Sequence, residues 1–391
     1  LTEYFLARIK EFDSDNKVFI TVTAARARAE ALAARDRARA GLRRGPLDGV
    51  PISWKDLVDS SGTPTTGASK IFRNRVPEQD ALILKRATRA GLICLGKTNL
   101  SEFAFSGLGI NPAFGTPINP YDKNTARCPG GSSAGSAVSV AAGLAAMTIG
   151  TDTGGSVRIP AAWNHLVGLK TTSGVVSTQG VLPLSRQFDT VGPLAKTVAD
   201  AAALFAVLAA TKSIDLTGTS LKNTCFIAPK NCVWDDAEPD LKEQVELAIS
   251  KLAEGGAIIL TENIPEFDEG TKLCNNLGNV FSPEAYAEWR PEIEHHGDDI
   301  HEEVMRRFKI AETMSSIATA EAIHKLRDIR GRYLKRVAGV DGVLMPTTPI
   351  LPPAIEPLEQ DSKAYAAANL AALHNTRIGN LLALSAITLP A

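Results

Sequence analysis

The chain has 391 residues, of which 44% are hydrophobic and 22% charged, values ordinary for a globular protein with a large core. Its 42 basic and 43 acidic residues nearly cancel, so no overall positive field favours nucleic acid or an anionic membrane. The five cysteines form no C-x-x-C pair, and no spacing typical of zinc ligands occurs, so neither a disulfide framework nor a metal site is predicted. The absence of a signal peptide and of a membrane-spanning apolar run predicts a cytoplasmic protein without membrane contact.

Helices and strands are predicted to alternate near the start of the chain. Phe5, Leu6, Ile9 and Phe12 recur at helical spacing and predict an amphipathic helix followed by a short strand. Residues 24–42 are rich in Ala, Arg and Glu and predict a second helix. Their interspersed acidic residues indicate a solvated helix face rather than RNA contact.

A lysine stands at the end of the next predicted strand. Val50, Ile52 and Trp54 alternate as in a strand, and Lys55 and Asp56 follow them. Burial between apolar neighbours would lower the pKa of Lys55 and let it act as a base. A salt bridge to the adjacent Asp56 explains the same residues equally well, so both interpretations stay open here.

Residues 91–98, GLICLGKT, match the phosphate-binding pattern G-x-x-x-x-G-K-T. That loop needs a strand before its first glycine and a helix beginning at its lysine. Here residues 79–90 predict a helix, and residues 92–95 predict the strand itself. The glycines therefore mark a helix-to-strand turn, and nucleotide binding is not predicted.

Glycine and serine cluster at both ends of residues 128–162, in GGSSAGS at 130–136 and GGS at 154–156. Consecutive glycines let several amide groups turn toward one point, and a serine after such a turn is placed like a nucleophile beside an oxyanion hole. The alternative is two flexible surface loops. The apolar helix predicted at 133–147 and the strand at 148–151 argue for a buried, catalytic arrangement.

Residues 131–135 also satisfy the nucleophile-elbow pattern G-x-S-x-G, with Ser133 at its centre. An elbow requires a buried strand that runs directly into it, whereas a polar, proline-bearing loop precedes Ser133. An esterase of the α/β-hydrolase type that uses Ser133 is therefore kept as an alternative only.

The character of the chain changes after the apolar helix predicted at 198–210, and residues 213–300 are expected to form a peripheral lobe. His295, His296 and His301 cluster, but the neighbouring acidic residues indicate an exposed helix start rather than a metal site. The further expected elements are helices at 238–254, 283–336 (broken by Pro291 and by a turn at 295–299) and 363–383, and strands at 258–260, near 342, and at the end.

The motifs resemble the amidase signature family, over nearly the whole chain. The stretches LDGVPISWKDLVD, LGKTNLSEFAFSG, PGGSSAGSA, GTDTGGSVRIPAA and FDTVGPLAKTVADA carry the resemblance. It implies one α/β domain over residues 1–391, with a central mixed β-sheet wrapped by helices. It also implies no cofactor and, in many members, a homodimer. Members usually continue beyond the point where this sequence stops, so the C-terminal end of the family fold is expected to be absent.

The resemblance assigns a Ser-cisSer-Lys triad to Ser156, Ser132 and Lys55. It implies that Ser156 attacks an amide carbonyl while its proton passes through Ser132 to neutral Lys55. The oxyanion hole maps to the backbone amides of Thr153, Gly154, Gly155 and Ser156. The expected reaction is hydrolysis of a small carboxamide to a carboxylate and ammonia through a Ser156 acyl-enzyme.

Ile159 stands where the A subunits of glutamyl- and aspartyl-tRNA amidotransferases have glutamine. An apolar residue there favours a neutral or apolar acyl group, and the amidotransferase component, which would need partner proteins and tRNA, is kept as an alternative. Phe105, Ser106 and Ile159 are predicted to line the pocket of a small-molecule amide.

Overall fold

A fully buried strand, β2 (Pro51–Lys55), lies inside the main sheet of the computed structural model, which describes residues 1–15, 17–277 and 279–390. It runs parallel to both of its neighbours, β3 (Ile93–Thr98) and β4 (Met147–Asp152). The other strands of this sheet are β1 (Phe19–Val22), β5 (Val167–Lys170), β6 (Thr190–Ala195) and β10 (Ala386–Thr388). The order is β1-β3-β2-β4-β6-β5-β10, and the remaining pairs are antiparallel. The predicted mixed central sheet is confirmed.

Helices cover both faces of this sheet. On one face, α3 (Leu82–Ala90) and α6 (Val198–Ala209) bury their apolar sides against β2, β4 and β6. The other face carries α1 (Thr2–Phe12), α2 (Ala24–Arg39), α4 (Ala134–Ala141) and α5 (Arg158–Trp163). Because side chains alternate along a strand, Ile52 and Trp54 lie in the core formed with α3 and α6. Ser53 points to the opposite face, where its hydroxyl bonds Ser139 of α4.

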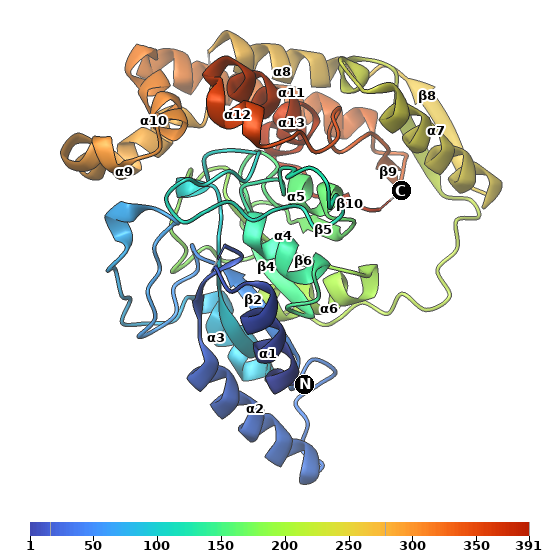
Figure 1. Ribbon diagram of the computed structural model, residues 1–391. Coiled ribbons are helices and arrows are strands. Elements are labelled where there is room, and N and C mark those ends of the chain that lie inside the picture. Colours follow the sequence, from blue (N-terminus) through green and yellow to red (C-terminus); the bar gives the residue numbers. More distant parts are fainter. Residues whose placement is uncertain (16, 278, 391) are drawn as a thin grey trace.

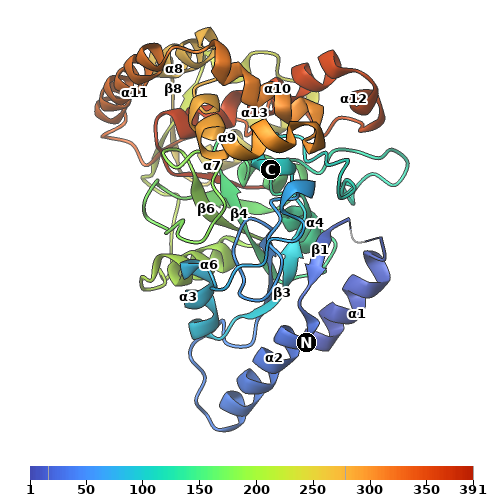
Figure 2. The same ribbon diagram turned by 90° about the vertical axis from the view of Figure 1, so that its left-hand side faces the viewer.

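A layer of helices from the second half of the chain lies across one end of the main sheet, opposite α1 and α2 (Figures 1 and 2). It consists of α8 (Pro265–Asn276), α9 (Ser282–His296), α10 (Glu302–Lys309), α11 (Ser316–Arg336), α12 (Glu356–Gln360) and α13 (Ser362–Leu381). Beside it, a parallel sheet of β8 (Ile258–Glu262), β7 (Cys225–Pro229) and β9 (Gly342–Val343) is flanked by α7 (Pro239–Glu254). β9 joins this sheet from outside residues 213–300, and a separate lobe there stays a prediction.

Several expected elements differ in length or continuity. The helical stretch expected over 283–336 consists of α9, which is kinked at Trp289, then α10 and α11. The helix expected over 133–147 ends at Ala141, because Gly143 takes a positive φ of 70° and Met147 already begins β4. The strand expected near 342 is only two residues long and half-buried. No helix among the described residues is both long and apolar enough to cross a membrane.

The segment that matches the phosphate-binding pattern has the geometry expected of a helix-to-strand turn. Gly91 caps α3 with a φ of 90°, and Lys97 lies within β3, fully buried. Its Nζ lies 2.8 Å from Asp56 Oδ1 and donates to Thr65 Oγ1 at 2.8 Å. Lys97 is therefore half of a buried ion pair, which is a structural role.

We predict that Lys97→Met lowers the free energy of unfolding by about 3 kcal/mol or more, because Asp56 would be left as a buried, unpaired charge. Urea denaturation measures the loss. Lys242→Met, in an exposed i,i+4 pair of α7, is the matched control and should change stability by about 0.5 kcal/mol or less. Equal stability of the two variants would contradict the structural role of Lys97.

Candidate active site

Lys55 is buried, and no carboxylate of the described residues pairs with it. Its Nζ donates to Ser132 Oγ and to Thr151 Oγ1, both at 2.7 Å, and its side chain is inaccessible to solvent. Burial lowers the pKa of Lys55 to about 7, and the more distant charges of Asp152 and Asp189 oppose this shift only in part. Of the two interpretations left open above, the salt bridge to Asp56 does not form, because Asp56 pairs with Lys97.

The first Gly/Ser segment is held in a slot lined by backbone. The Gly131–Ser132 peptide is cis, Gly131 N donates to Gly107 O at 2.7 Å, and Ser132 O accepts from Ser101 N at 3.1 Å. A Cβ on Gly131 would lie within 2.7 Å of Gly109 N and Ser106 O. Only glycine fits at position 131. This segment is therefore held tightly and is not the flexible surface loop considered as the alternative above.

Ser133, unlike Ser132, forms no hydrogen bond with Lys55. It lies immediately before α4, and the residues that precede it form a loop rather than a strand. Its buried hydroxyl donates to Ser156 O at 2.5 Å, and its backbone N–H donates to the same oxygen at 3.2 Å. No histidine bonds to it within the described residues. Ser133 thus ties the two Gly/Ser segments together and lacks the base that an elbow serine would need.

The second Gly/Ser segment, residues 153–156, connects β4 to α5. In the described part of the chain, none of its four backbone N–H groups donates to a protein acceptor, as an oxyanion hole requires. Gly155 has a φ of 141°, and a Cβ there would lie only 2.7 Å from Thr376 Cβ. Thr376 of α13 also donates to Gly154 O at 2.8 Å, so the helical layer holds this loop in place.

Two buried aspartates flank the loop, with opposite pKa shifts. Burial alone would raise the pKa of Asp152. Arg158, which contacts both carboxylate oxygens at 3.0 Å, and a hydrogen bond from Asn380 instead lower this pKa to about 2. Burial raises the pKa of Asp189 to about 6, although Thr153 Oγ1 donates to it at 2.5 Å. Both carboxylates are ionised at neutral pH and favour a positive charge on Lys55.

A narrow pocket lies beside Ser156. Its walls are Ala104, Phe105, Ser106, Thr153, Gly154, Ser156, Leu184, Asn279, Phe281, Arg307, Leu373 and Arg377. The structure thus places Phe105 and Ser106 in the wall. Ile159 is not among the lining residues, because it faces a buried cluster behind the wall.

Several residues at the site were missed from the sequence. Thr151 and Asp189 stand in quoted family motifs and could have been found there. Arg307 and Arg377 come from α10 and α13, far along the chain, and no local pattern distinguishes them from surface arginines. Among the described residues, no three His, Cys, Asp or Glu side chains converge as metal ligands would.

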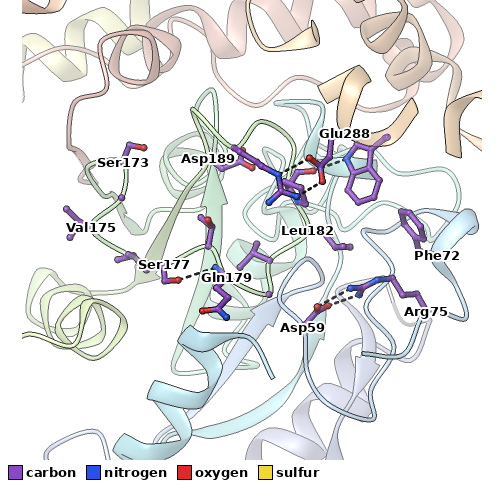
Figure 3. A pocket seen from close by; sticks show the side chains of 18 of the residues that line it. Asp59, Phe72, Arg75, Ser173, Val175, Ser177, Gln179, Leu182, Asp189 and Glu288 are labelled. Carbon is purple, nitrogen blue, oxygen red and sulfur yellow. Dashed lines mark hydrogen bonds and ion pairs between the residues drawn. The ribbon is translucent and has the colours of Figure 1, made fainter. Parts of the chain in front are cut away.

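A larger hollow, open to solvent, is lined by Asp189 among other residues (Figure 3). Four of its charged side chains form two pairs, Arg75 with Asp59 at 2.6 Å and Arg186 with Glu288 at 2.5 Å. Because Ser156 does not line it, the small pocket is the better candidate for the site of chemistry.

The mixed sheet with its covering helices is the fold of a solved amidase. The Amidase family model matches residues 1–391, and the chain belongs to this family, whose members are hydrolases of carbon–nitrogen bonds.

Three relatives illustrate the likeness. The chain is 36% identical over 369 residues to a 2-amino-5-chloromuconic acid deaminase of Comamonas testosteroni, covering 94% of this chain and 79% of the relative. It is 44% identical over 229 residues to the glutamyl-tRNA(Gln) amidotransferase A subunit of Anaeromyxobacter sp. (strain K), covering 59% of this chain and 46% of that protein. A solved amidase structure superimposes with a TM-score of 0.86 at 30% identity, covering 99% of this chain and 87% of that one.

We predict that Gly155→Ala reduces kcat by roughly 100-fold or more, because the new Cβ would displace the loop whose amides face the pocket. Steady-state kinetics on a carboxamide, with thermal unfolding alongside, measures the effect. Gly331→Ala in α11, where a Cβ meets nothing within 4 Å, is the control and should keep full activity. A fully active Gly155→Ala enzyme would contradict a positioned loop.

Proposed function

We propose that the protein hydrolyses the C–N bond of a small carboxamide to a carboxylate and ammonia through an acyl-enzyme on Ser156. The observation that carries this proposal is the pair formed by buried Lys55 and Ser132, 2.7 Å apart, with the pKa of the lysine near 7. A lysine that is half neutral at physiological pH can take a proton and return it.

In the proposed acylation, Ser156 Oγ attacks the amide carbon, its proton moves to Ser132 Oγ, and the Ser132 proton moves to Lys55 Nζ. The amides of residues 153–156 stabilise the oxyanion, a contribution of about 3 kcal/mol per donor in comparable sites. When the intermediate collapses, the proton returns through Ser132 to the leaving nitrogen, which departs as ammonia. Water then attacks the ester by the same route and releases the carboxylate.

The two aspartates support the transient charge in this cycle. Lys55 is neutral before the attack and becomes an ammonium as the oxyanion forms. Asp152 and Asp189 both favour that ammonium, while burial disfavours it. The balance keeps the pKa of Lys55 close to neutrality, which suits a group that must both accept and donate a proton.

The expected neutral or apolar acyl group rested on Ile159, which faces the core rather than the pocket, so that argument does not constrain the substrate. The homodimer implied by the family resemblance stays a prediction.

A second candidate is the glutamine-hydrolysing component of a tRNA-dependent amidotransferase, favoured by the 44% identity over 229 residues. Such a component would hydrolyse glutamine within an assembly. Turnover of glutamine by the isolated chain, or its dependence on added partner proteins, separates this candidate from a free-standing amidase.

We predict that a fluorophosphonate labels Ser156, and that Lys55→Met abolishes labelling because no base remains to take the serine proton. Peptide mass spectrometry locates the adduct. Arg89→Met on the exposed end of α3 serves as the control and should label normally. An adduct on Ser133 would instead support the elbow mechanism.

The pH profile supplies an independent test. Since neutral Lys55 is the base, kcat/KM should rise about tenfold per pH unit below roughly 7 and level off above it. Asp189→Asn removes a negative charge that raises the pKa of Lys55, so the acidic limb should move to lower pH. A profile that falls as pH rises through 7 would exclude Lys55 as the base.

A further inference from the structure

Two arginines from the helical layer face the pocket that contains Ser156. Arg307 comes from α10 and Arg377 from α13, and both line the pocket wall. The Arg307 guanidinium lies over the Phe105 ring, with Cζ 4.8 Å from the ring centroid. Arg307 Nε is out of contact with solvent and has no acceptor. The Phe105 ring thus orients the Arg307 guanidinium, and the Nε–H group of Arg307 is left without an acceptor among the described residues.

Neither arginine has a carboxylate partner among the described residues. Arg377 is 8% exposed, and its side-chain bonds go to neutral groups, Asn275 Oδ1 at 3.3 Å and Cys274 Sγ at 3.9 Å. Glu303, the acid on α10 that acts on Arg307 from a distance, lies 3.8 Å from Arg306 instead. Burial lowers the pKa of Arg307 to about 10, which still leaves it charged at neutral pH.

Several other arginines of this protein are paired with carboxylates. Arg158 holds Asp152 at 3.0 Å, and the hollow in Figure 3 contains the pairs of Arg75 with Asp59 and Arg186 with Glu288. A buried cation without a counter-charge is unfavourable unless a ligand provides the anion. Arg377 is buried and Arg307 half-buried, and two cations without carboxylate partners in one pocket point to an anionic ligand.

We infer that the pocket binds a carboxylate between Arg307 and Arg377, so that the substrate is the monoamide of a small dicarboxylic acid. This inference rests on the proposed function for the amide end, which Ser156 would attack. Guanidinium groups present forked donors that match a carboxylate, and Arg307 has a free donor. Phe105, Leu184, Phe281 and Leu373 supply apolar walls for the carbon chain between the two ends.

The same pocket selects against an ammonium group. No Asp or Glu is among its lining residues in the described part of the chain, so an α-amino group would be placed near two cations without an acceptor of opposite charge. Glutamine, which carries both an α-carboxylate and an α-ammonium, is therefore a poor substrate.

The test compares glutaramate, the monoamide of glutaric acid, with neutral butyramide and with glutamine. We expect kcat/KM for glutaramate to exceed that for each of the others by about 100-fold. Arg377→Gln and Arg307→Gln should reduce the glutaramate-to-butyramide ratio at least tenfold, mainly through KM, and Arg377→Lys should restore part of it. Arg186→Gln, in the hollow of Figure 3, should keep the ratio of the native enzyme.

A binding measurement separates this inference from the proposed function. Glutarate should bind the native protein in calorimetric titrations and bind at least tenfold more weakly to Arg377→Gln, whether or not any amide is hydrolysed. Thermal unfolding checks that each variant is folded. Glutarate binding without amide hydrolysis would overturn the proposed function and support the anion site. Equal turnover of butyramide and glutaramate, faster turnover of glutamine, or no binding of glutarate would overturn the inference.

Discussion

The site depends on one constraint, namely that a lysine is buried and that its hydrogen-bond partners in the described structure are two hydroxyl groups. Lys55 keeps this environment because Asp56, the next residue in the chain, is paired with Lys97 on the adjacent strand. Strands β2 and β3 are in register at Lys55 and Thr98, which brings the two lysines close along the sheet. Because the Asp56 carboxylate is paired with Lys97, burial has the largest effect on the pKa of Lys55.

Backbone packing then fixes the groups around that lysine. Ser133 joins the two Gly/Ser segments by donating twice to Ser156 O, and Gly150 of β4 leaves room for its hydroxyl. On the opposite side, Thr376 bonds the Gly154 carbonyl and occupies the space that a Gly155 side chain would need. Helix α13 is thus part of the support for the free amides as well as of the pocket wall.

The sequence predicted those parts of the site that depend on local pattern. Local pattern singled out Lys55 at a strand end and the glycine turns at 130–136 and 154–156, whereas the roles of Ser132 and Thr153 came only from the family resemblance. The sequence could not decide between a neutral Lys55 and a salt bridge to Asp56, because the outcome depends on Lys97, a strand away. Ile159 is expected in the pocket because the amidotransferase A subunits have glutamine at that position, yet the first turn of α5 directs it into the core. Arg307 and Arg377 need the tertiary packing of α10 and α13, which no local periodicity reveals.

The fold therefore separates two tasks. The proposed proton relay and the free amides lie on the sheet and the loops that follow β2 and β4, where close backbone contacts leave little tolerance for change. The charge of the pocket comes from Arg307 and Arg377, on helices laid across the end of that sheet, and of these helices α13 also supports the loop through Thr376. In the proposed enzyme, an exchange of one of these arginines alters which acyl group is held, while Lys55, Ser132 and the loop of residues 153–156 keep their positions. The proposed amide-cleaving centre can thus serve different substrates, because charge selection uses side chains that take no part in the proposed proton relay.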